Sequence, residues 1–392
     1  MKKNLLAHAD GLHLPQWLVE KIQRTNYALS DFMHITLISN RATEQVFMVA
    51  KADMDNLKRN DRSMATLMNI PFSALAPTLC NSQDWEAFVN GTPMTRAVDA
   101  VQRAMPSVDM LTQRDIYHYN RTYVQMMKDV LHMSVLGAPL LGISMELADY
   151  LRALPIDRLE VAVQNMRFPL FRWRFNEPLF WHEYTAGWLS EEFVAHYIMQ
   201  TSPMRAASLP HQALWANLRL DRIENETYAT ALMQQGFRAS TAADLFKLNT
   251  TKARNKYKEI HGVSSPCGCL PSSLAWYVEN PINRVQSTTY TWLYRCALAS
   301  DANIPRALIS ANDLMAKLFG TKLRIIADRA NHLTGKMASD SQLTMGPCRS
   351  CGTPYILLNG DSRIELAHHF ICPGCSHQLA PKGTSSKRKQ PQ

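Results

Sequence analysis

The 392-residue sequence lacks the motifs that mark most soluble enzymes. It has no phosphate-binding GxxxxGK[ST] loop, no GxSxG nucleophile turn, no HExxH metal motif and no GxGxxG between a strand and a helix. Acidic residues such as Glu177 and Glu183 are scattered among aromatic residues without a repeated pairing. This pattern favours helix caps and ion pairs over acid–base catalysis. We therefore predict that the protein is not an enzyme.

Long uncharged apolar runs are also missing. The most apolar window, Val130–Leu151, contains Pro139, Glu146 and Asp149, so it suits a buried helical hairpin better than a membrane span. The apolar stretch near the N-terminus meets His8 too soon for a secretory signal. We expect a soluble cytoplasmic protein with no membrane partner.

Basic excess is absent from the first part of the chain and concentrated in the second. Residues 1–234 hold 22 Lys and Arg against 24 Asp and Glu, whereas residues 235–392 hold 20 against 9. The length suggests two or three domains. We expect the C-terminal part to contact a polyanion and the N-terminal part to assemble or regulate.

Period-two alternation is rare, and the helical period dominates, so the predicted fold class is mainly α-helical. Phe171–Phe175 is a short alternating run, and Tyr355–Leu358 with His369–Ile371 suits a small hairpin. Prolines at 71 and 155 are typical of helix starts. Apolar spacing predicts helices over 17–30, 114–133, 145–152, 158–166 and 192–199, with ends at Asn165 and Gly262.

One internal repeat is suggested. Leu67–Leu75 and Leu151–Leu159 share the pattern L-x-x-[IL]-P-x-x-x-L, 84 residues apart, and Tyr27 would then correspond to Tyr123 after an insertion. Leucines at helical spacing also recur by chance in helical proteins, so both interpretations stay open. A real repeat would make 1–110 and 111–190 two copies of one small helical domain.

The strongest local signal is a pair of CxxC motifs separated by 20 residues, Cys348/Cys351 and Cys372/Cys375. Four thiolates at this spacing are typical of a closed, structural Zn²⁺ site, which leaves no position for a catalytic water. A redox or free-thiol pair is the alternative. We predict one zinc ribbon over 341–380.

Other metal ligands are less favoured. Three histidines near the ribbon are alternatives to one cysteine: His368, His369 and His377. Cys267 and Cys269 are predicted to lie in a loop, and Cys80 and Cys296 in the core.

The segment 239–260 is typical of a helix-turn-helix. A first helix is predicted over Ala242–Lys247, and Thr250 or Thr251 is predicted to cap a second helix. Three residues of the second helix are predicted to face inward: Ala253, Tyr257 and Ile260. The predicted DNA contacts are Lys247, Thr251, Lys252, Arg254, Asn255, Lys256 and Lys258; a solvated basic helix face is the alternative.

The last segment, 381–392, is short, basic and polar, which predicts a disordered tail. Lys387, Arg388 and Lys389 would either add phosphate contacts or only improve solubility.

With these motifs in place, residues from about 215 to 385 resemble the FlhC family of bacterial transcriptional activators. Gly262-x3-Pro266-x-Gly268-x-Leu270-Pro271-x-Ser273-x2-Trp276-Tyr277 fills every fixed position of the family pattern, and the four cysteines fall where FlhC carries its zinc ligands. The resemblance implies a helical domain over 191–340 followed by the ribbon. Two departures are a longer span between the CxxC motifs and the cysteines at 267 and 269.

Residues from about 115 to 180 resemble FlhD, the partner of FlhC, although the match is weaker residue by residue. The resemblance rests on Asn120–Tyr123, Leu141–Ala148, Leu151–Pro155, Leu159 and Phe171–Phe175. FlhC and FlhD assemble as four FlhD with two FlhC. If 1–110 is a diverged second FlhD-like unit, a homodimer of this chain would rebuild that composition.

The resemblance implies a sequence-specific DNA-binding activator that contacts RNA polymerase at promoters and dimerises, or pairs with FlhD/FlhC-type partners. Members of the family switch on flagellar genes, and relatives on conjugative elements switch on transfer genes, which suits a fused form at least as well. The alternative function is a zinc-ribbon adaptor that binds RNA or protein without activating transcription.

Overall fold

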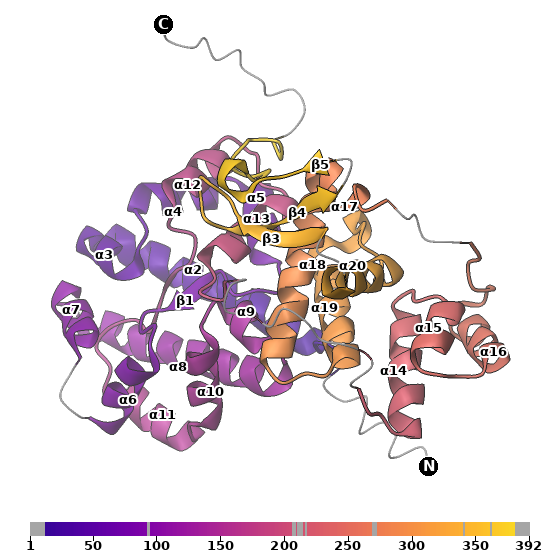
Figure 1. Cartoon of the computed structure of the whole chain (residues 1–392). Coiled ribbons are helices and arrows are strands. Elements are labelled where there is room, and N and C mark those ends of the chain that lie inside the picture. The colour runs from indigo at the N-terminus through magenta and orange to yellow at the C-terminus, as the bar shows by residue number, and fades with distance from the viewer. Residues whose placement is uncertain are drawn as a thin grey trace, which may run out of the picture.

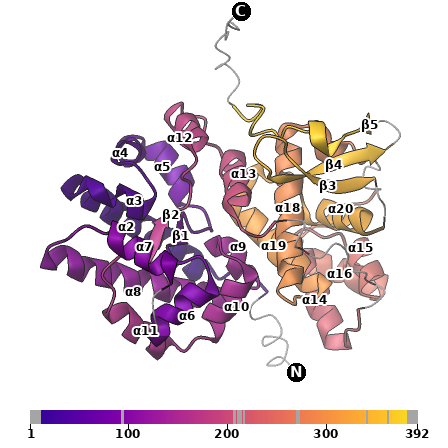
Figure 2. The same ribbon diagram turned by 60° about the vertical axis from the view of Figure 1, so that its left-hand side comes forward.

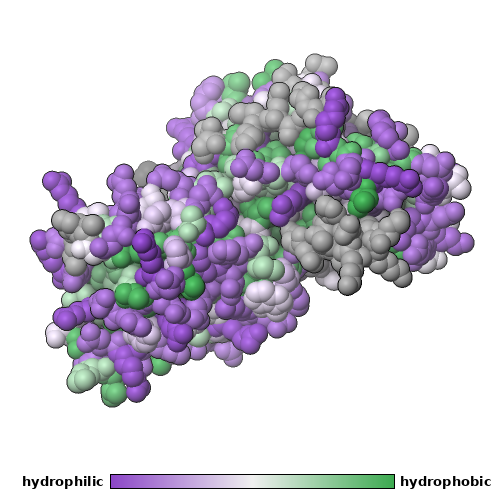
Figure 3. All heavy atoms as spheres, turned by 90° about the horizontal axis from the view of Figure 1, so that it is seen from below, coloured by the Kyte–Doolittle hydropathy of each residue, from purple (hydrophilic) through white to green (hydrophobic). Residues whose placement is uncertain are grey.

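The computed structural model describes residues 12–91, 95–205, 209, 215, 218–268, 273–339, 342–360 and 363–380. It is mainly helical, as the sequence predicted (Figure 1). None of the described helices is long and apolar enough to cross a membrane. The face seen from below is mostly hydrophilic, with hydrophobic side chains in small separate groups (Figure 3). The basic tail with Lys387, Arg388 and Lys389 lies outside the described residues.

Apart from one short turn of helix, the N-terminal half contains the same order of elements twice. The first set is α2 (Gln16–Ser39), a short turn of helix η1 (Arg41–Thr43), α3 (Glu44–Phe47), α4 (Lys51–Arg59), α5 (Asp61–Met68), β1 (Leu75–Pro77), α6 (Ser82–Asn90) and α7 (Arg96–Ala104). The second set is α8 (Met110–Met133), α9 (Gly137–Leu141), α10 (Met145–Ala153), α11 (Ile156–Gln164), β2 (Phe171–Trp173), α12 (Pro178–Thr185) and α13 (Glu191–Thr201). We call these sets the first and second repeat units.

The long helices α2 and α8 show how closely the units correspond. Each is 24 residues long, and residue 16 corresponds to 110 as residue 39 does to 133, a shift of 94. Eight buried positions of α2 have buried counterparts at this shift. They are Ile22, Asn26, Leu29, Ser30, Phe32, Met33, Thr36 and Leu37, matched by Ile116, Asn120, Tyr123, Val124, Met126, Met127, Val130 and Leu131.

The two units are related by a local two-fold axis at the strands. β1 and β2 pair antiparallel, with Ala76 opposite Arg172. These two residues are equivalent positions of the two units, 96 residues apart in the sequence, so each equivalent position pairs with the other. The bonds beyond the strands are reciprocal as well: the Thr78 N–H donates to Leu170 O at 2.9 Å, and the Arg174 N–H donates to Ala74 O at 3.1 Å. Such reciprocity is the signature of a symmetric dimer interface, here built within one chain.

A buried asparagine fixes each strand to its long helix. Asn120 in α8 donates Nδ2 to Phe168 O at 2.9 Å, and its Oδ1 accepts the Leu170 N–H at 2.7 Å. Asn26 makes the equivalent two bonds, at 3.0 and 2.9 Å, with the backbone just before β1. Because this backbone is buried, the amide supplies hydrogen bonds that water cannot.

Asn120→Ala should lower the free energy of unfolding by about 2–6 kcal/mol, because it leaves a buried carbonyl and a buried N–H without partners, at about 1–3 kcal/mol each. Urea unfolding of the full chain measures the change. Gln113→Ala on the exposed side of the same helix is the control, with an expected change within about 0.5 kcal/mol. Equal losses in the two variants would contradict the bracing role of Asn120.

The structural repeat differs from the sequence match that suggested it. Leu67 lies in α5, whereas Leu151 lies in α10, and α10 corresponds to α4. Pro71 lies after α5 and does not start a helix, while Pro155 is the N-cap of α11. The shared leucine–proline pattern at 84 residues is therefore a coincidence of helical spacing. The second unit also extends beyond residue 190, through α13.

The C-terminal half consists of helices covered by a small ribbon. The helices are α14 (Arg222–Gln234), α15 (Ala239–Leu245), α16 (Thr250–His261), α17 (Trp276–Glu279), α18 (Pro281–Ala299), α19 (Ile304–Phe319), the short turn of helix η4 (Gly320–Lys322) and α20 (Ala327–Ser339). α18 and α19 form its centre, and α13 packs against α18 at the boundary with the N-terminal half (Figure 2).

The ribbon has strands β3 (Leu343–Pro347), β4 (Pro354–Gly360) and β5 (Arg363–Ile364), followed by a turn of helix η5 (Ala367–His369). β4 pairs with β3 on one side and β5 on the other. The prediction that Tyr355–Leu358 pairs with His369–Ile371 is wrong, because the β4 residues pair with β3. β3 was missed because it is short and ends in Gly-Pro.

Candidate metal centre and nucleic-acid interface

The basic segment forms a three-helix unit. α15 and α16 pack on each other and on α14 (Figure 1), which in turn packs on α19. α14 begins with a capping box, in which Asp221 and Glu224 each accept the other's backbone N–H. In Figure 1 the three helices project on the side away from the repeat units.

The turn between α15 and α16 differs in detail from the prediction. α15 spans Ala239–Leu245 and stops before Lys247, which has a left-handed backbone with φ 52°. The cap of α16 is Asn249, whose side chain accepts the Lys252 N–H at 3.1 Å, and neither predicted threonine serves. An asparagine directly before the helix takes this role as well as a threonine does.

α16 has one buried and one exposed face. Ala253 and Tyr257 are buried, as predicted, and Ile260 is half-buried. Thr251, Asn255 and Lys258, spaced by four and three residues, lie on the opposite face of the helix and are exposed. Lys252 and Arg254 are exposed on its two flanks. The predicted contact residues of the helix therefore occur on its solvent side.

The cations of this region are not equivalent. Lys256 is half-buried and forms an ion pair with Glu259 at 3.1 Å. Four others are exposed and form no ion pair within the described residues: Lys247, Lys252, Arg254 and Lys258. These four are available to an external anion, whereas Lys256 is already partly neutralised.

A buried ion pair holds the three-helix unit in place. Arg238, just before α15, lies 2.8 Å from the Asp328 carboxylate on α20, and its backbone N–H donates to the same group at 3.1 Å. Burial raises the pKa of Asp328, and Arg238 counteracts this effect. Breaking such a pair on one side leaves a buried charge. The pair therefore ties the start of α15 to α20.

The CxxC motifs converge at the ends of the ribbon strands. Cys348 follows β3 and Cys351 precedes β4, so the hairpin brings both near the second motif. Cys351 Sγ and Cys372 Sγ lie 3.8 Å apart, far beyond a disulfide bond. Thiolates at about 2.3 Å from a tetrahedral Zn²⁺ are about 3.8 Å apart, so this spacing fits a metal ion.

The group of side chains that could hold a metal ion includes a residue that the sequence did not indicate. Four ligand atoms, one each on His196, Cys351, Cys372 and Cys375, lie within 4.8 Å of one another. Cys348 is buried beside them, and its Sγ accepts the Cys372 N–H at 3.2 Å. The described residues thus offer five side chains around one site, one of them from α13.

Ionisation of one thiol in the cluster opposes ionisation of its neighbours. Hydrogen bonds from Cys372 and Cys375 lower the pKa of Cys351, whereas the pKa values of Cys372 and Cys375 are raised next to it. A bound cation removes this conflict by stabilising all the thiolates. Burial lowers the pKa of His196 to about 4, so its imidazole is neutral at pH 7, the form that binds metal.

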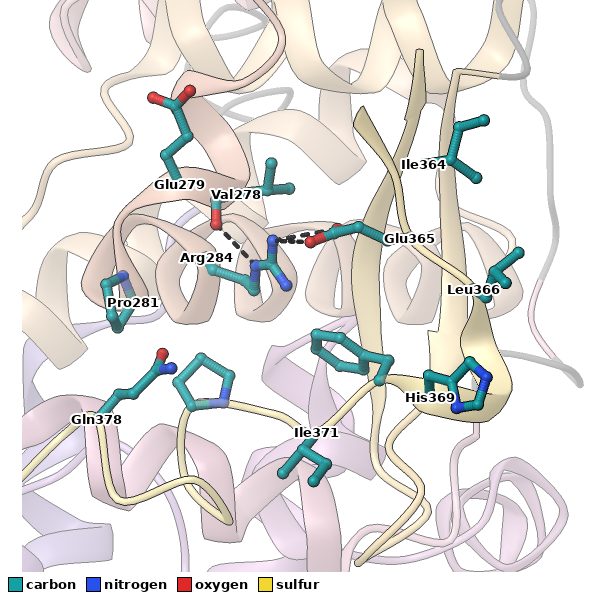
Figure 4. Close-up of a pocket in the computed structure, with 12 residues that line it drawn as sticks. Val278, Glu279, Pro281, Arg284, Ile364, Glu365, Leu366, His369, Ile371 and Gln378 are labelled. Carbon is teal, nitrogen blue, oxygen red and sulfur yellow. Dashed lines mark hydrogen bonds and ion pairs between the residues drawn. The ribbon is translucent and has the colours of Figure 1, made fainter. Parts of the chain in front are cut away.

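The histidines considered from the sequence lie elsewhere. His377 Nδ1 is 3.6 Å from Glu183 on α12, whose pKa burial raises to about 7. His368 and His369 lie in η5, and His369 lines a pocket of about 360 Å³ between the ribbon and α18 (Figure 4). In that pocket Arg284 pairs with Glu365 at 2.8 Å and anchors the ribbon to α18.

The remaining cysteines follow the predictions only in part. Cys296 is buried in the core and Cys267 is exposed, as expected. Cys80 is exposed, and the Arg172 guanidinium donates to its sulfur at 3.1 Å, so its assignment to the core is wrong. Cys269 lies outside the described residues.

Comparison with known proteins gives a consistent result for the C-terminal half. Residues 220–390 match the family model described as Flagellar transcriptional activator (FlhC). We refer to residues 220–390 as the FlhC-family domain because of this match. Among curated relatives, the flagellar transcriptional regulator FlhC of Cupriavidus metallidurans is 26% identical over 175 residues, which are 44% of this chain and 78% of the relative. FlhC of Burkholderia lata is 28% identical over 160 residues, 38% of this chain and 68% of the relative.

The FlhC-family domain contains both features described above. It includes α14–α16 and all four cysteines of the CxxC motifs. The two repeat units precede it, and so does His196 on α13. The candidate metal-binding group therefore combines side chains of the FlhC-family domain with one side chain from outside it.

Proposed function

We propose that this chain is a sequence-specific DNA-binding transcriptional regulator whose FlhC-family domain contacts promoter DNA through α16. The observation that carries the proposal is the exposed face of α16, which presents polar and unpaired basic side chains after a helix-turn-helix turn. The names of both curated relatives support it, since each is a flagellar transcriptional regulator.

Within the interface, the residues divide by chemistry. Asn255, at the centre of the exposed face, can form two hydrogen bonds with an adenine edge in the major groove, and Thr251 can reach a neighbouring base. Lys252, Arg254 and Lys258 contact phosphates, which position the helix without selecting a sequence. Lys247 in the preceding turn adds a further phosphate contact.

The metal centre has a structural role in this proposal. The sulfur spacing and the all-thiolate or thiolate–imidazole donor set fit one Zn²⁺, which stabilises the ribbon when bound. Cys351, Cys372 and Cys375 hold the ion, and Cys348 lies beside them. The ribbon in turn packs on α18, where the Ile356 N–H donates to Thr288 Oγ1 at 3.2 Å.

The repeat units are proposed to be two FlhD-like units in tandem. Their pseudo-two-fold pairing through β1 and β2 supports this proposal, because it places two copies of one fold in a dimer-like arrangement before one FlhC-family domain. A homodimer of the chain would then contain four FlhD-like and two FlhC-like units. Activation would follow from contact with RNA polymerase, at flagellar or conjugative-transfer promoters.

The decisive test is selection of double-stranded fragments from the host genome by the purified full chain, with Asn255→Ala as the variant. We expect a few promoter fragments to be enriched, and the variant to lose about 1–3 kcal/mol of discrimination at one base pair. Equal binding of random DNA, or preferential binding of RNA, would reject the proposal in favour of an adaptor. The genes next to the enriched fragments would identify the regulon.

A further inference from the structure

We propose that His196 is a ligand of the metal ion, together with Cys351, Cys372 and Cys375, so that the metal joins the second repeat unit to the ribbon. This inference rests on the metal centre proposed above. His196 lies on α13, outside the FlhC-family match, whereas the three cysteines belong to the ribbon. The ion would thus cross-link two parts of the chain.

The orientation of the imidazole favours ligation. His196 is only 1% exposed, and its Nδ1 lies 2.9 Å from the hydroxyl of Tyr355 at the start of β4. Nε2 is then the nitrogen left for the thiol cluster. A metal-binding histidine commonly has its other ring nitrogen fixed by such a hydrogen bond, and Tyr355 is itself fully buried.

The second CxxC motif is shaped to accept this ring. A Cβ atom at Gly374 would lie 2.5 Å from Cδ2 and 2.7 Å from Nε2 of His196. Gly374 is not among the glycines with a left-handed backbone, in contrast to Gly352 after the first motif. The reason for a glycine at 374 is therefore the close approach of His196, and not the turn itself.

The duplication offers an internal comparison. α7 of the first unit and α13 of the second begin after capping residues, Thr95 and Ser190, each of which accepts the N–H three residues on. Counted from these caps, the counterpart of His196 is Val101. The first unit has no ribbon packed on this helix in the described structure, so a histidine occurs where a metal site is present.

Electrostatics also favours this set over four thiolates. Three thiolates and a neutral imidazole around Zn²⁺ leave one net negative charge, and four thiolates leave two, which cost more to bury. Cys348 then serves as a buried sulfur that accepts the Cys372 N–H and orients the second motif. Cys372 Sγ accepts the Cys375 N–H at 3.4 Å in the same way, so N–H···S contacts hold the second motif at both of its cysteines.

The test is zinc X-ray absorption on the full wild-type chain, combined with Co²⁺ spectra of His196→Ala and Cys348→Ser. We expect one metal per chain with three sulfur neighbours and one nitrogen neighbour. Cys348→Ser should retain the Co²⁺ spectrum, whereas His196→Ala should shift it and weaken metal binding by more than the roughly 10- to 100-fold that loss of an outer contact causes.

Each failure points to a different part of the argument. Four sulfur neighbours in the wild-type zinc site, or loss of one sulfur in Cys348→Ser, would overturn the role of His196 while leaving a metal centre in place. A wild-type chain that binds no stoichiometric metal would reject the proposed metal centre itself. The wild-type measurement decides the question even if His196→Ala does not fold.

Discussion

Removal of the metal ion from the full chain should unfold residues 343–380 and abolish specific DNA binding. The ribbon has only three strands, and its two CxxC segments lie outside them, so no strand pairing holds the buried thiols of Cys348 and Cys372 in place. Structural Zn²⁺ contributes about 10–16 kcal/mol at pH 7 in small zinc domains, which is at least comparable to the whole free energy of unfolding of a typical domain, about 5–15 kcal/mol. Its loss leaves ionisable thiols in a buried cluster. Hydrogen exchange of the chelated protein would locate the loss of protection.

Cys351→Ser should reproduce the effect of the chelator, because Cys351 lies in both ligand sets considered for the site. Cys80→Ser is the matched control, since Cys80 is exposed in the first repeat unit and far in the sequence from the ribbon. The control should keep one metal per chain and full protection of β3 and β4. Unchanged protection of the ribbon after measured loss of the metal would contradict a structural role for the ion.

The metal site shows what a linear pattern can and cannot predict. The CxxC pairs were predictable because each pair lies within one turn, and the turn alone brings its two sulfurs together. His196 was not, because a single histidine on an apolar helix carries no local signal of metal binding. Only tertiary packing of α13 against the ribbon brings it to the cysteines. The close approach of His196 to Gly374 is a consequence of that packing.

The duplication of the repeat units was also only partly predictable from the sequence. The repeated leucine pattern matched the wrong helices, α5 and α10, because leucines at helical spacing occur in helices that are not equivalent. The feature that both units share is a buried asparagine, Asn26 or Asn120, whose side-chain amide forms hydrogen bonds with the backbone just before a strand. One asparagine in an apolar stripe at the same place in two 24-residue helices is the signal that could have identified the duplication.

For α16, the period of the helix was sufficient to predict which residues are buried and which are exposed. Ala253 and Tyr257 lie on the inner face, as expected from their spacing. The sequence could not predict that Lys256 pairs with Glu259, because water competes with the Glu259 carboxylate for an ammonium group on the helix surface. The pair separates Lys256 from the cations that are free to contact DNA.

Neutralising the three exposed basic residues of α16 that form no ion pair within the described residues should cause the largest loss of DNA affinity among surface variants. In Lys252→Ala/Arg254→Ala/Lys258→Ala, three phosphate contacts are removed, and each contact contributes about 0.9 to the slope of log affinity against log salt. We therefore expect the slope to fall by about 2.7 and the affinity at 0.15 M salt to fall by about 100-fold. Both promoter and random DNA should lose affinity to the same degree, because phosphates carry no sequence information.

The control must separate a local contact from a change in net charge. Arg41→Ala/Arg103→Ala/Arg222→Ala removes the same charge from exposed positions on other elements and should leave the slope almost unchanged. Titrations of fluorescent DNA at several salt concentrations measure the slopes of both triple variants. If they lost affinity equally, the basic residues of α16 would act only through the overall charge, and the helix would not lie on the DNA. A selective loss in the α16 variant would instead place this helix at the phosphate backbone, where Asn255 and Thr251 can reach the bases.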